Sequence, residues 1–578
     1  MYLMLIFYGL FPWLRATNFN TSAGQEFLVL FLPNKDAIVE SSKLTLFVTV
    51  HRRCTAPVLV NITTPSYTGF SAITETVSNN EGKCVNLPGN LRINSDEEFV
   101  KKVIRVRSNC TIRLWGLNQQ IQSTDGFVLL PISEMSIERN EQQIVWYKAV
   151  CWHDFKQYCQ IAIAVRYNNT KLRIEFPKQI TTTNVTNYRN SILSEFEALY
   201  IKTVRPFDLT GTVISSDKPI SVFSGNDVTR VHDPSTRVRG HDHLCVQLTP
   251  VNTWGMSVYS DPTPELNPNY YKLIPARLGT TVLYRAYQTT GSMSNCTIRY
   301  LNNSSAKDFS RENLNQLKII VNSGWILLRV KAGCYLVITA EGPVSLTRFI
   351  HSHSRLVPNS DPSMVTLPPV QQFDNSYSFL VPENASRSGE KYTNWVHIAY
   401  SQPPDKSDKI QFHVDDILIN QDRIVELESM RFIKVKISSG FHSIGNNASH
   451  PFSVVVYGSF RYESYLFSLG QKLNIINELK PVWRRENEDG QVTVRELIHG
   501  WTNRNPETDR RKSSALARGL FHIGDTNNDG FITAEDIKPL YKQFDMNKDE
   551  TVSKDEFLQF WINVSNRCRN NRLSEVSS

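Results

Sequence analysis

The sequence predicts a multidomain protein in which all-β modules, expected to be repeated β-sandwich-like units, precede a small all-α domain. The chain has 578 residues, and a single hydrophobic core stops growing near roughly 250–300 residues, so we expect at least two domains. Polar and apolar residues alternate with a period of two from Gly24 to about Phe460. Helical spacing and charge replace this alternation from about residue 470.

The chain begins with an apolar run, MYLMLIFYGLFPWL, that has the length of a secretory signal peptide and is too short to span a bilayer. We assign residues 1–23 to a signal peptide, with Ala23 and Ala16 as alternative cleavage points. No later apolar stretch reaches transmembrane length, and the polar tail at residues 567–578 does not resemble a glycolipid-anchor signal. We therefore expect a secreted, extracellular protein with no membrane span.

Glycosylation signals and cysteines fit the same compartment. Sequons of the N-x-S/T type occur at Asn20, Asn61, Asn109, Asn168, Asn184, Asn295, Asn302, Asn303, Asn384, Asn447 and Asn563.

Nine cysteines without a CxxC motif are typical of disulfides rather than of catalytic thiols or zinc ligands. Candidate pairs are Cys54–Cys84, Cys151–Cys159 and Cys296–Cys334. The odd count leaves one cysteine over, and Cys568 is the candidate for an intermolecular disulfide.

The net charge is a mild +8 over the whole chain, and its basic residues are scattered apart from short runs. A surface that follows a phosphate backbone needs clustered Lys and Arg. We therefore expect no nucleic-acid partner.

The region 24–465 is predicted to be all-β. The segment KLTLFVTV at residues 43–50 shows the alternation, and β-branched and aromatic residues abound in it. A phrase beginning with proline recurs at Pro131, Pro250 and Pro369, at intervals of 119 residues. A companion phrase recurs as VRSNCTIRLWGLN, ISSDKPISVFSGN, ITAEGPVSLTRF and HPFSVVVYGS. The region is thus either a set of related modules of about 119 residues or a β protein whose turn phrases are alike by chance.

Four ordered phrases of this region resemble one known family. They are GQEFLVLFLPN at residues 24–34, LWGLNQQIQSTDGFVLLP at 114–131, DLTGTVISSDKPISVFSGN at 208–226 and HDHLCVQLTPVNTWG at 241–255. Together they resemble the amino-terminal domain of the IgGFc-binding protein family. The resemblance implies a secreted, β-rich binding or scaffold domain of mucus and body-surface secretions, with no catalytic residues.

This chain differs from the family pattern in two ways. The von Willebrand type D modules that follow the domain in mucin-like members are absent. A family cysteine just before the Asp-His-Leu phrase is His241 here, with Cys245 nearby, so the family's local disulfide is not carried over. Binding of antibody Fc is likewise not carried over, because no residue here indicates it.

The C-terminal region, residues 470–566, carries calcium-loop motifs. Calcium takes six to eight oxygen ligands, and a twelve-residue EF-hand loop supplies them from positions 1, 3, 5, 7, 9 and 12 with glycine at position 6. The loop DTNNDGFITAED at residues 525–536 fits this pattern, with Gly530 at the turn. Its predicted ligands are Asp525, Asn527, Asp529, Phe531 (through its carbonyl), Thr533 and Asp536. Because the last ligand is Asp rather than Glu, weaker calcium binding is expected.

A second loop, DMNKDETVSKDE at residues 545–556, has a complete ligand set but Glu550 in place of the glycine. Its predicted ligands are Asp545, Asn547, Asp549, Thr551, Ser553 and Glu556. A third loop at residues 485–496 begins with Arg485, whose charge opposes a cation, so we expect it to be metal-free. The two better loops begin only 20 residues apart, which favours a structural role over a calcium switch.

The remaining motifs give no support to catalysis. The chain has no HExxH, GxSxG, Walker or GxGxxG motif, so we expect no enzyme. The cluster of His232, Asp233, His241, Asp242, His243 and Cys245 is either a transition-metal site or a structural turn. The oxidising compartment and the match to a family phrase favour the turn.

The sequence therefore predicts a secreted, calcium-binding recognition or scaffold protein. In this hypothesis the β region binds a glycan, a mucin or a surface protein, and Ca²⁺ in the EF-hands is structural. The alternative is a structural matrix component, gel-forming or mineral-associated, whose calcium binding is itself the function. A long acidic tract that would favour the alternative is missing.

Overall fold

The computed structural model describes most of the chain up to Leu479. The described residues are 21–35, 42–51, 54, 57–78, 81–132, 145–152, 158–177, 188–203, 207–232, 238–263, 268–293, 295–301, 314–353, 361–383, 390–402, 410–420, 424–460, 463–477 and 479. The chain divides into two compact units, Met1–Pro481 and Val482–Ser578. Among the described residues, secondary structure consists of strands and a few 3-10 turns, without an α-helix. The predicted all-β region is thus confirmed, while the predicted all-α domain lies outside the described residues.

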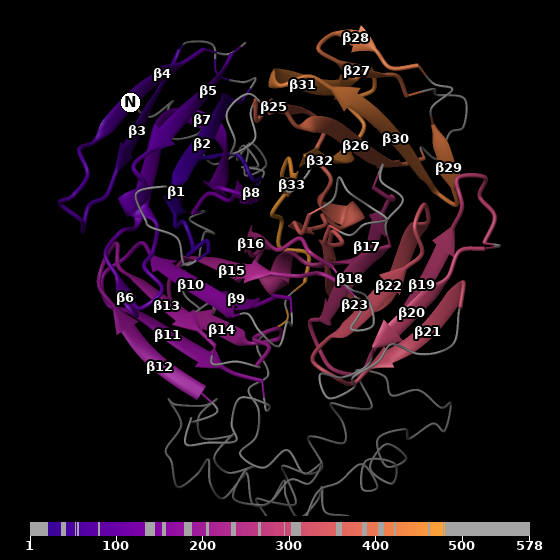
Figure 1. Ribbon diagram of the computed structural model, residues 1–578, viewed down its shortest axis with the longest axis horizontal. Coiled ribbons are helices and arrows are strands. Elements are labelled where there is room, and N and C mark those ends of the chain that lie inside the picture. Colours follow the sequence, from indigo (N-terminus) through magenta and orange to yellow (C-terminus); the bar gives the residue numbers. More distant parts are fainter. Residues whose placement is uncertain are drawn as a thin grey trace, which may run out of the picture. The chain divides into compact units, whose positions relative to one another are not determined.

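The strands fall into four consecutive modules, which follow one another around a common centre in Figure 1. Module 1 contains β1 (Gly24–Val29), β2 (Lys43–Val50), β3 (Val58–Thr63), β4 (Ile73–Val77), β5 (Gly82–Leu87), β7 (Ile104–Gln120) and β8 (Ser123–Leu129). Module 2 contains β9 (Val145–Lys148), β10 (Cys159–Val165), β11 (Thr170–Glu175), β12 (Tyr188–Leu193), β13 (Ala198–Lys202), β14 (Val213–Ser216), β15 (Ile220–Thr229) and β16 (Asp242–Gln247). The short β6 (Phe99–Val100) pairs with β13 and so links module 1 to module 2.

Modules 3 and 4 complete the unit. Module 3 contains β17 (Gly255–Ser260), β18 (Asn269–Pro275), β19 (Thr280–Tyr287), β20 (Ile298–Leu301), β21 (Gln316–Val321), β22 (Ile326–Val330), β23 (Tyr335–Phe349) and β24 (Met364–Thr366). Module 4 contains β25 (Tyr377–Val381), β26 (Thr393–Ser401), β27 (Phe412–Val414), β28 (Ile417–Leu418), β29 (Val425–Leu427), β30 (Met430–Ile437), β31 (Gly440–Asn446), β32 (Phe452–Phe460) and β33 (Glu463–Ser468).

All four modules pair their strands in the same order. In module 1 the first half of β7 pairs with β1 and β3, and its second half with β2 and β8. In module 3 the long strand β23 likewise pairs with β17 and β19, then with β18 and β24. In modules 2 and 4 the long strand is split in two, into β14 and β15 and into β31 and β32, with the same partners in order. Each module therefore has two layers joined by one long or split strand.

The recurring sequence phrases lie at equivalent places in this topology. The companion phrases cover the long or split strand of each module. Pro250 and Pro369 each precede a 3-10 turn, Val251–Thr253 and Val370–Gln372, that leads into the first strand of the next module. Pro131 follows β8 in the corresponding position after module 1.

The last strand of every module lies at the centre of the unit. Strands β8, β16, β24 and β33 contact one another, and Figure 1 shows β8, β16 and β33 where the modules meet. Side chains on both faces of β16 and β33 are buried. This two-sided burial differs from an outer strand such as β3, where buried and exposed residues alternate. The centre is therefore packed by strands from four modules that are far apart in sequence.

A segment after β33, residues 469–479, ties the four modules together, and we call it the strap. Gln471 exchanges backbone and side-chain hydrogen bonds with Ser22 at the start of module 1. A mature chain keeps Ser22 if cleavage follows Ala16, the alternative given above, and loses it if cleavage follows Ala23. Asn474 pairs with Gln372, and Asn477 donates to the carbonyls of Val251 and Trp254. The second residue of the strap is Gly470, whose φ of 105° and close approach to Ser22 exclude a side chain. It ends where the Trp146 indole donates to the carbonyl of Leu479.

Truncation of the strap should destabilise the β region. A chain ending at Ser468 loses the hydrogen bonds to modules 1, 2, 3 and 4, whereas a chain ending at Pro481 keeps them. We expect a melting temperature several degrees lower for the shorter chain, because each lost hydrogen bond contributes about 0.5–1.5 kcal/mol to the free energy of unfolding. Thermal unfolding of the two chains measures this difference, and equal melting temperatures would show that the strap contributes nothing.

Three disulfides are present among the described residues. Cys151–Cys159 and Cys296–Cys334 form as the sequence suggested. The candidate pair Cys54–Cys84 is wrong, because Cys54 pairs with Cys110. Val50 at the end of β2 lies opposite Ile112 of β7, so the chain that continues to Cys54 reaches Cys110 on that strand. Cys84 lies on β5, opposite Phe47 and on the other side of β2, and it is an exposed free thiol.

The free thiols should differ in reactivity. In the folded protein a thiol reagent should label the exposed Cys84 and spare the buried Cys245, which becomes reactive only after denaturation. Peptide mapping without reduction should recover Cys54 joined to Cys110. A Cys54–Cys84 peptide would contradict the fold described for module 1.

Candidate functional site

The twelve predicted calcium ligands, in the loops at residues 525–536 and 545–556, lie outside the described residues, as does Cys568. The positions of these residues are therefore not described, and the two ligand sets remain predictions. The polar groups that can be described belong to Met1–Pro481, and many of them gather where the four inner strands, β8, β16, β24 and β33, meet.

Part of the histidine-rich cluster lies at this centre. His243 on β16 is buried, and its ring contacts the Asn118 side chain at 3.2 Å and the carbonyl oxygen of Asp227 at 3.3 Å. Burial lowers the pKa of His243 to about 3, so the ring is neutral. Both ring nitrogens thus have protein partners. His243 is therefore placed as a structural core residue rather than as a transition-metal ligand.

The one described group of metal-type side chains that lie close together is Cys151, Cys159 and Asp208. The two sulfurs form a disulfide, so they are not free to bind a metal. This group therefore has a structural role.

Asp125, on the inner strand β8, joins all four modules. Its carboxylate accepts hydrogen bonds from the backbone N–H of Gly126 at 2.9 Å and of Cys245 on β16 at 3.1 Å. It also accepts from Met364 on β24, at 3.4 Å, and from Leu466 on β33. Burial raises the pKa of Asp125 well above its usual range, against the lowering effect of these four donors. The Asp125 side chain thus accepts one backbone hydrogen bond from each of the strands β8, β16, β24 and β33.

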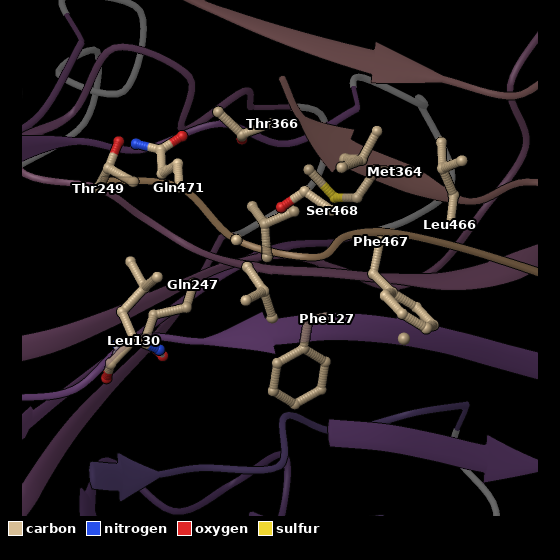
Figure 2. A pocket seen from close by; sticks show the side chains of 15 residues that line it. Phe127, Leu130, Gln247, Thr249, Met364, Thr366, Leu466, Phe467, Ser468 and Gln471 are labelled. Atoms are coloured by element: carbon tan, nitrogen blue, oxygen red, sulfur yellow. Dashed lines mark hydrogen bonds between the residues drawn. The ribbon is translucent and has the colours of Figure 1, made fainter. Parts of the chain in front are cut away.

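A cavity of about 20 Å³ lies beside Asp125 between the inner strands, and Figure 2 shows its lining side chains. Phe127, Gln247, Met364 and Phe467 come from the four inner strands, one from each. A cavity holds a water molecule only above roughly 10–15 Å³, so this space suits one or two waters and no organic ligand.

Ion pairs bridge the junctions between modules. Arg113 of module 1 binds Asp374, at the entry to module 4, at 2.7 Å and lies over the ring of Tyr377. Burial opposes ionisation of Asp374, but Arg113 outweighs it and lowers the pKa of that carboxyl. Lys272 of module 3 binds Asp208 of module 2 at 2.6 Å, and both side chains are almost fully buried. Such pairs fix the modules against one another, because separating them would leave buried charges unpaired.

The junction of modules 3 and 4 has a similar cluster. Asp261 accepts a short hydrogen bond from His397 and lies 3.8 Å from both Arg348 and Lys434. Burial would raise the pKa of Asp261, but the His397, Lys434 and Arg348 groups lower it below its usual value. The junctions described are thus held by charge pairs as well as by apolar packing.

One surface arrangement in module 4 resembles a catalytic triad in composition. The Asp415 carboxylate lies 2.6 Å from His442 Nδ1, and the Ser438 hydroxyl lies 3.5 Å from Nε2. However, Nε2 lies closer, at 3.0 Å, to the backbone carbonyl oxygen of Ser438, to which it donates. A nitrogen that donates to a carbonyl cannot accept the serine proton, so the arrangement lacks the base that acyl transfer requires.

The fold and its centre define a modular, all-β protein with disulfides within its first three modules. The model of the family described as IgGFc binding protein matches residues 125–458, more than half of the chain, and the chain belongs to this family. The matched range runs from Asp125 on the inner strand of module 1 into β32 of module 4. An EF-hand model matches residues 517–538, which include the first predicted calcium loop. No curated protein sequence matches the chain significantly.

These matches confirm the family resemblance and the EF-hand that the sequence suggested. The sequence reasoning missed the central role of Asp125 and of three further carboxylates, Asp242, Asp361 and Glu463. A signal for two of them was present, because Asp242 and Asp361 are 119 residues apart, the interval that also separates Pro250 from Pro369. The described residues contain no helix long and apolar enough to cross a membrane.

Proposed function

We propose that this protein is a secreted, glycosylated, calcium-binding recognition or scaffold protein of mucus or body-surface secretions. In this proposal the outer surface of the β modules binds a glycan or a protein, and the EF-hand region has a structural role. Membership of the IgGFc-binding family together with the EF-hand match is the observation that carries the proposal. We further propose that the protein is not an enzyme.

Two structural features support secretion and glycosylation. Three disulfides link residues within modules 1, 2 and 3, and such bonds persist in oxidising compartments. The sequon asparagines that the structure describes are all exposed: Asn61, Asn109, Asn168, Asn295 and Asn447. An exposed asparagine can carry a bulky glycan without disturbing the core.

The proposal is tested with the secreted full chain and with a chain ending at Pro481. Both are applied to a glycan array and to a pull-down from native secretion. If the β modules are the recognition surface, the shorter chain retains the partners of the full chain. Loss of every partner on removal of residues 482–578 would instead favour a matrix component whose calcium-binding region is the functional part.

Calcium binding by the EF-hand region is tested separately by calorimetry. The full chain is compared with a double variant, Asp525→Ala with Asp545→Ala, which removes the first ligand of each loop. We expect the double variant to lose one or two calcium sites of millimolar or tighter affinity. Equal calcium uptake by the two proteins would contradict the assignment of these loops.

A further inference from the structure

The three residues that precede β1, Thr21–Ala23, are packed as part of module 1, and we call them the N-terminal segment. Ser22 is 2% exposed and Ala23 is 9% exposed, so both side chains are buried. The Thr21 hydroxyl oxygen accepts a hydrogen bond from the backbone N–H of Ala23 at 3.1 Å. The segment continues directly into β1, which pairs with β7. Its residues therefore belong to the folded β region.

The N-terminal segment pairs with the strap, which comes from the other end of the β region. Ser22 donates its backbone N–H to the carbonyl oxygen of Gln471 at 2.8 Å. The Ser22 hydroxyl oxygen accepts a hydrogen bond from the backbone N–H of Gln471 at 2.9 Å. Thr21 forms an antiparallel bridge with Lys472. The segment thus connects the start of module 1 to the chain that follows module 4.

Gly470 of the strap lies directly against Ser22. A Cβ atom at position 470 would lie 1.8 Å from the Ser22 Oγ atom, far inside van der Waals contact. Gly440 offers a comparison, because its φ of 110° is close to the 105° of Gly470, yet a Cβ atom there would meet nothing within 4 Å. Position 470 therefore lacks a side chain for two reasons, its backbone conformation and the presence of Ser22.

The two alternative cleavage points of the signal peptide have opposite consequences for these contacts. Cleavage after Ala23 removes the whole N-terminal segment, takes both hydrogen-bond partners from the Gln471 backbone and puts a charged amino group on the first residue of β1. Cleavage after Ala16 keeps the segment and every contact described for it. Alanine before the cleaved bond suits signal peptidase in both cases, so the contacts of the segment distinguish the two points.

We propose that the signal peptide is removed at the Ala16–Thr17 bond and that the N-terminal segment remains in the mature protein, where it holds the strap. Hydrolysis of this bond consumes one water molecule and leaves a carboxylate on Ala16 and an amino group on Thr17. This assignment rests on the proposed secretion of the protein. The mature chain then keeps the sequon Asn20-Thr21-Ser22, which cleavage after Ala23 would remove.

Sequencing of the N-terminus of the secreted full chain tests the assignment directly. The protein is collected from the medium and treated with an N-glycosidase, and its first residues are read by Edman degradation and by mass spectrometry of tryptic peptides. We expect Thr17 as the first residue and a peptide Thr17–Lys35. Trypsin itself cuts after Arg15 and yields a peptide that begins at Ala16, so processing and digestion are distinguished.

The alternative outcomes are separate from one another. A secreted protein that begins at Gly24 would overturn the assignment and leave the proposed function intact. A chain that stays inside the cell with Met1 in place would contradict secretion itself. Among processing variants, Ala16→Leu should abolish the Thr17 terminus and Ala23→Leu should retain it, because a bulky residue before the bond blocks cleavage. The reverse pattern would assign cleavage to Ala23.

Thermal unfolding tests the contact between the N-terminal segment and the strap. Two chains are secreted behind the same foreign signal peptide, one beginning at Thr17 and the other at Gly24. We expect a melting temperature several degrees lower for the chain beginning at Gly24, because it loses the hydrogen bonds to Gln471 and the burial of Ser22. Equal melting temperatures would overturn the role of the segment.

Two glycine variants separate the contact with Ser22 from backbone strain. Gly470→Ala and Gly440→Ala both place a side chain on a left-handed backbone, but only the first brings it against Ser22. In the chain beginning at Thr17, Gly470→Ala should lower the melting temperature more than Gly440→Ala does. This excess should disappear in the chain beginning at Gly24, and an equal excess in both chains would overturn the contact. If Gly470→Ala does not fold, the two unsubstituted chains decide.

Discussion

Replacing Asp125 with alanine should lower the free energy of unfolding of the β region by about 3–5 kcal/mol. The substitution removes the acceptor of four backbone N–H groups that come from β8, β16, β24 and β33. Each buried donor left without an acceptor costs about 1–3 kcal/mol, although water entering the new space recovers part of this. Chemical denaturation followed by tryptophan fluorescence measures the loss.

Asp217 provides the matched control for this prediction. It also accepts a backbone N–H, from Lys171 at 2.8 Å, but it is exposed, so water can replace it. Asp217→Ala should therefore change the free energy of unfolding by less than about 1 kcal/mol. Similar losses for the two variants would show that Asp125 is not the central link between the modules.

Replacing Asp208 with alanine should cost about 3–5 kcal/mol, because it leaves the Lys272 ammonium buried without its counter-ion. Lys272 also donates to the carbonyl of Cys151 at 2.7 Å and to the Thr210 hydroxyl at 3.0 Å, and its Nζ lies 4.3 Å from the Trp325 ring centroid. These neutral partners hold the ammonium in place but cannot neutralise it. Burial lowers the pKa of Lys272 and Asp208 raises it, so removal of Asp208 favours the neutral amine.

A double variant shows whether the loss comes from the unpaired charge. Asp208→Asn together with Lys272→Met replaces the ion pair by neutral groups of similar size. Substitution of both partners of a buried pair is often nearly neutral, so the double variant should be more stable than Asp208→Ala. A double variant that is less stable than Asp208→Ala would mean that packing, rather than charge, sets the energy of this junction.

The two predictions concern the same physical feature, a β assembly whose modules are joined by buried polar groups. Apolar packing alone tolerates sliding of one sheet against another, whereas a carboxylate with several donors has one favourable position. Asp125 and the Lys272–Asp208 pair thus specify how the modules meet.

Much of this architecture was accessible from the sequence. The alternation in KLTLFVTV predicted a strand, and the structure forms β2 there. The second half of β2 is buried on both faces, which the alternation did not predict. The 119-residue interval indicated repeated units, and the structure places Pro250 and Pro369 at equivalent turns. Local spacing was also sufficient for Cys151–Cys159, whose loop is short. Local spacing did not predict the partner of Cys54, which is Cys110, because this pairing depends on which strands become neighbours.

By itself, the sequence determined the β character of the described residues between 24 and 465, the family, and the presence of an EF-hand motif within residues 517–538. These features depend on residues close together in the chain, where periodicity and motif spacing are directly visible. Only the tertiary structure decided that Asp125, Asp242, Asp361 and Glu463 meet, and that residues 469–479 join the modules. The reason is that strand register and module packing set contacts between residues more than 100 positions apart, and no local pattern encodes that distance.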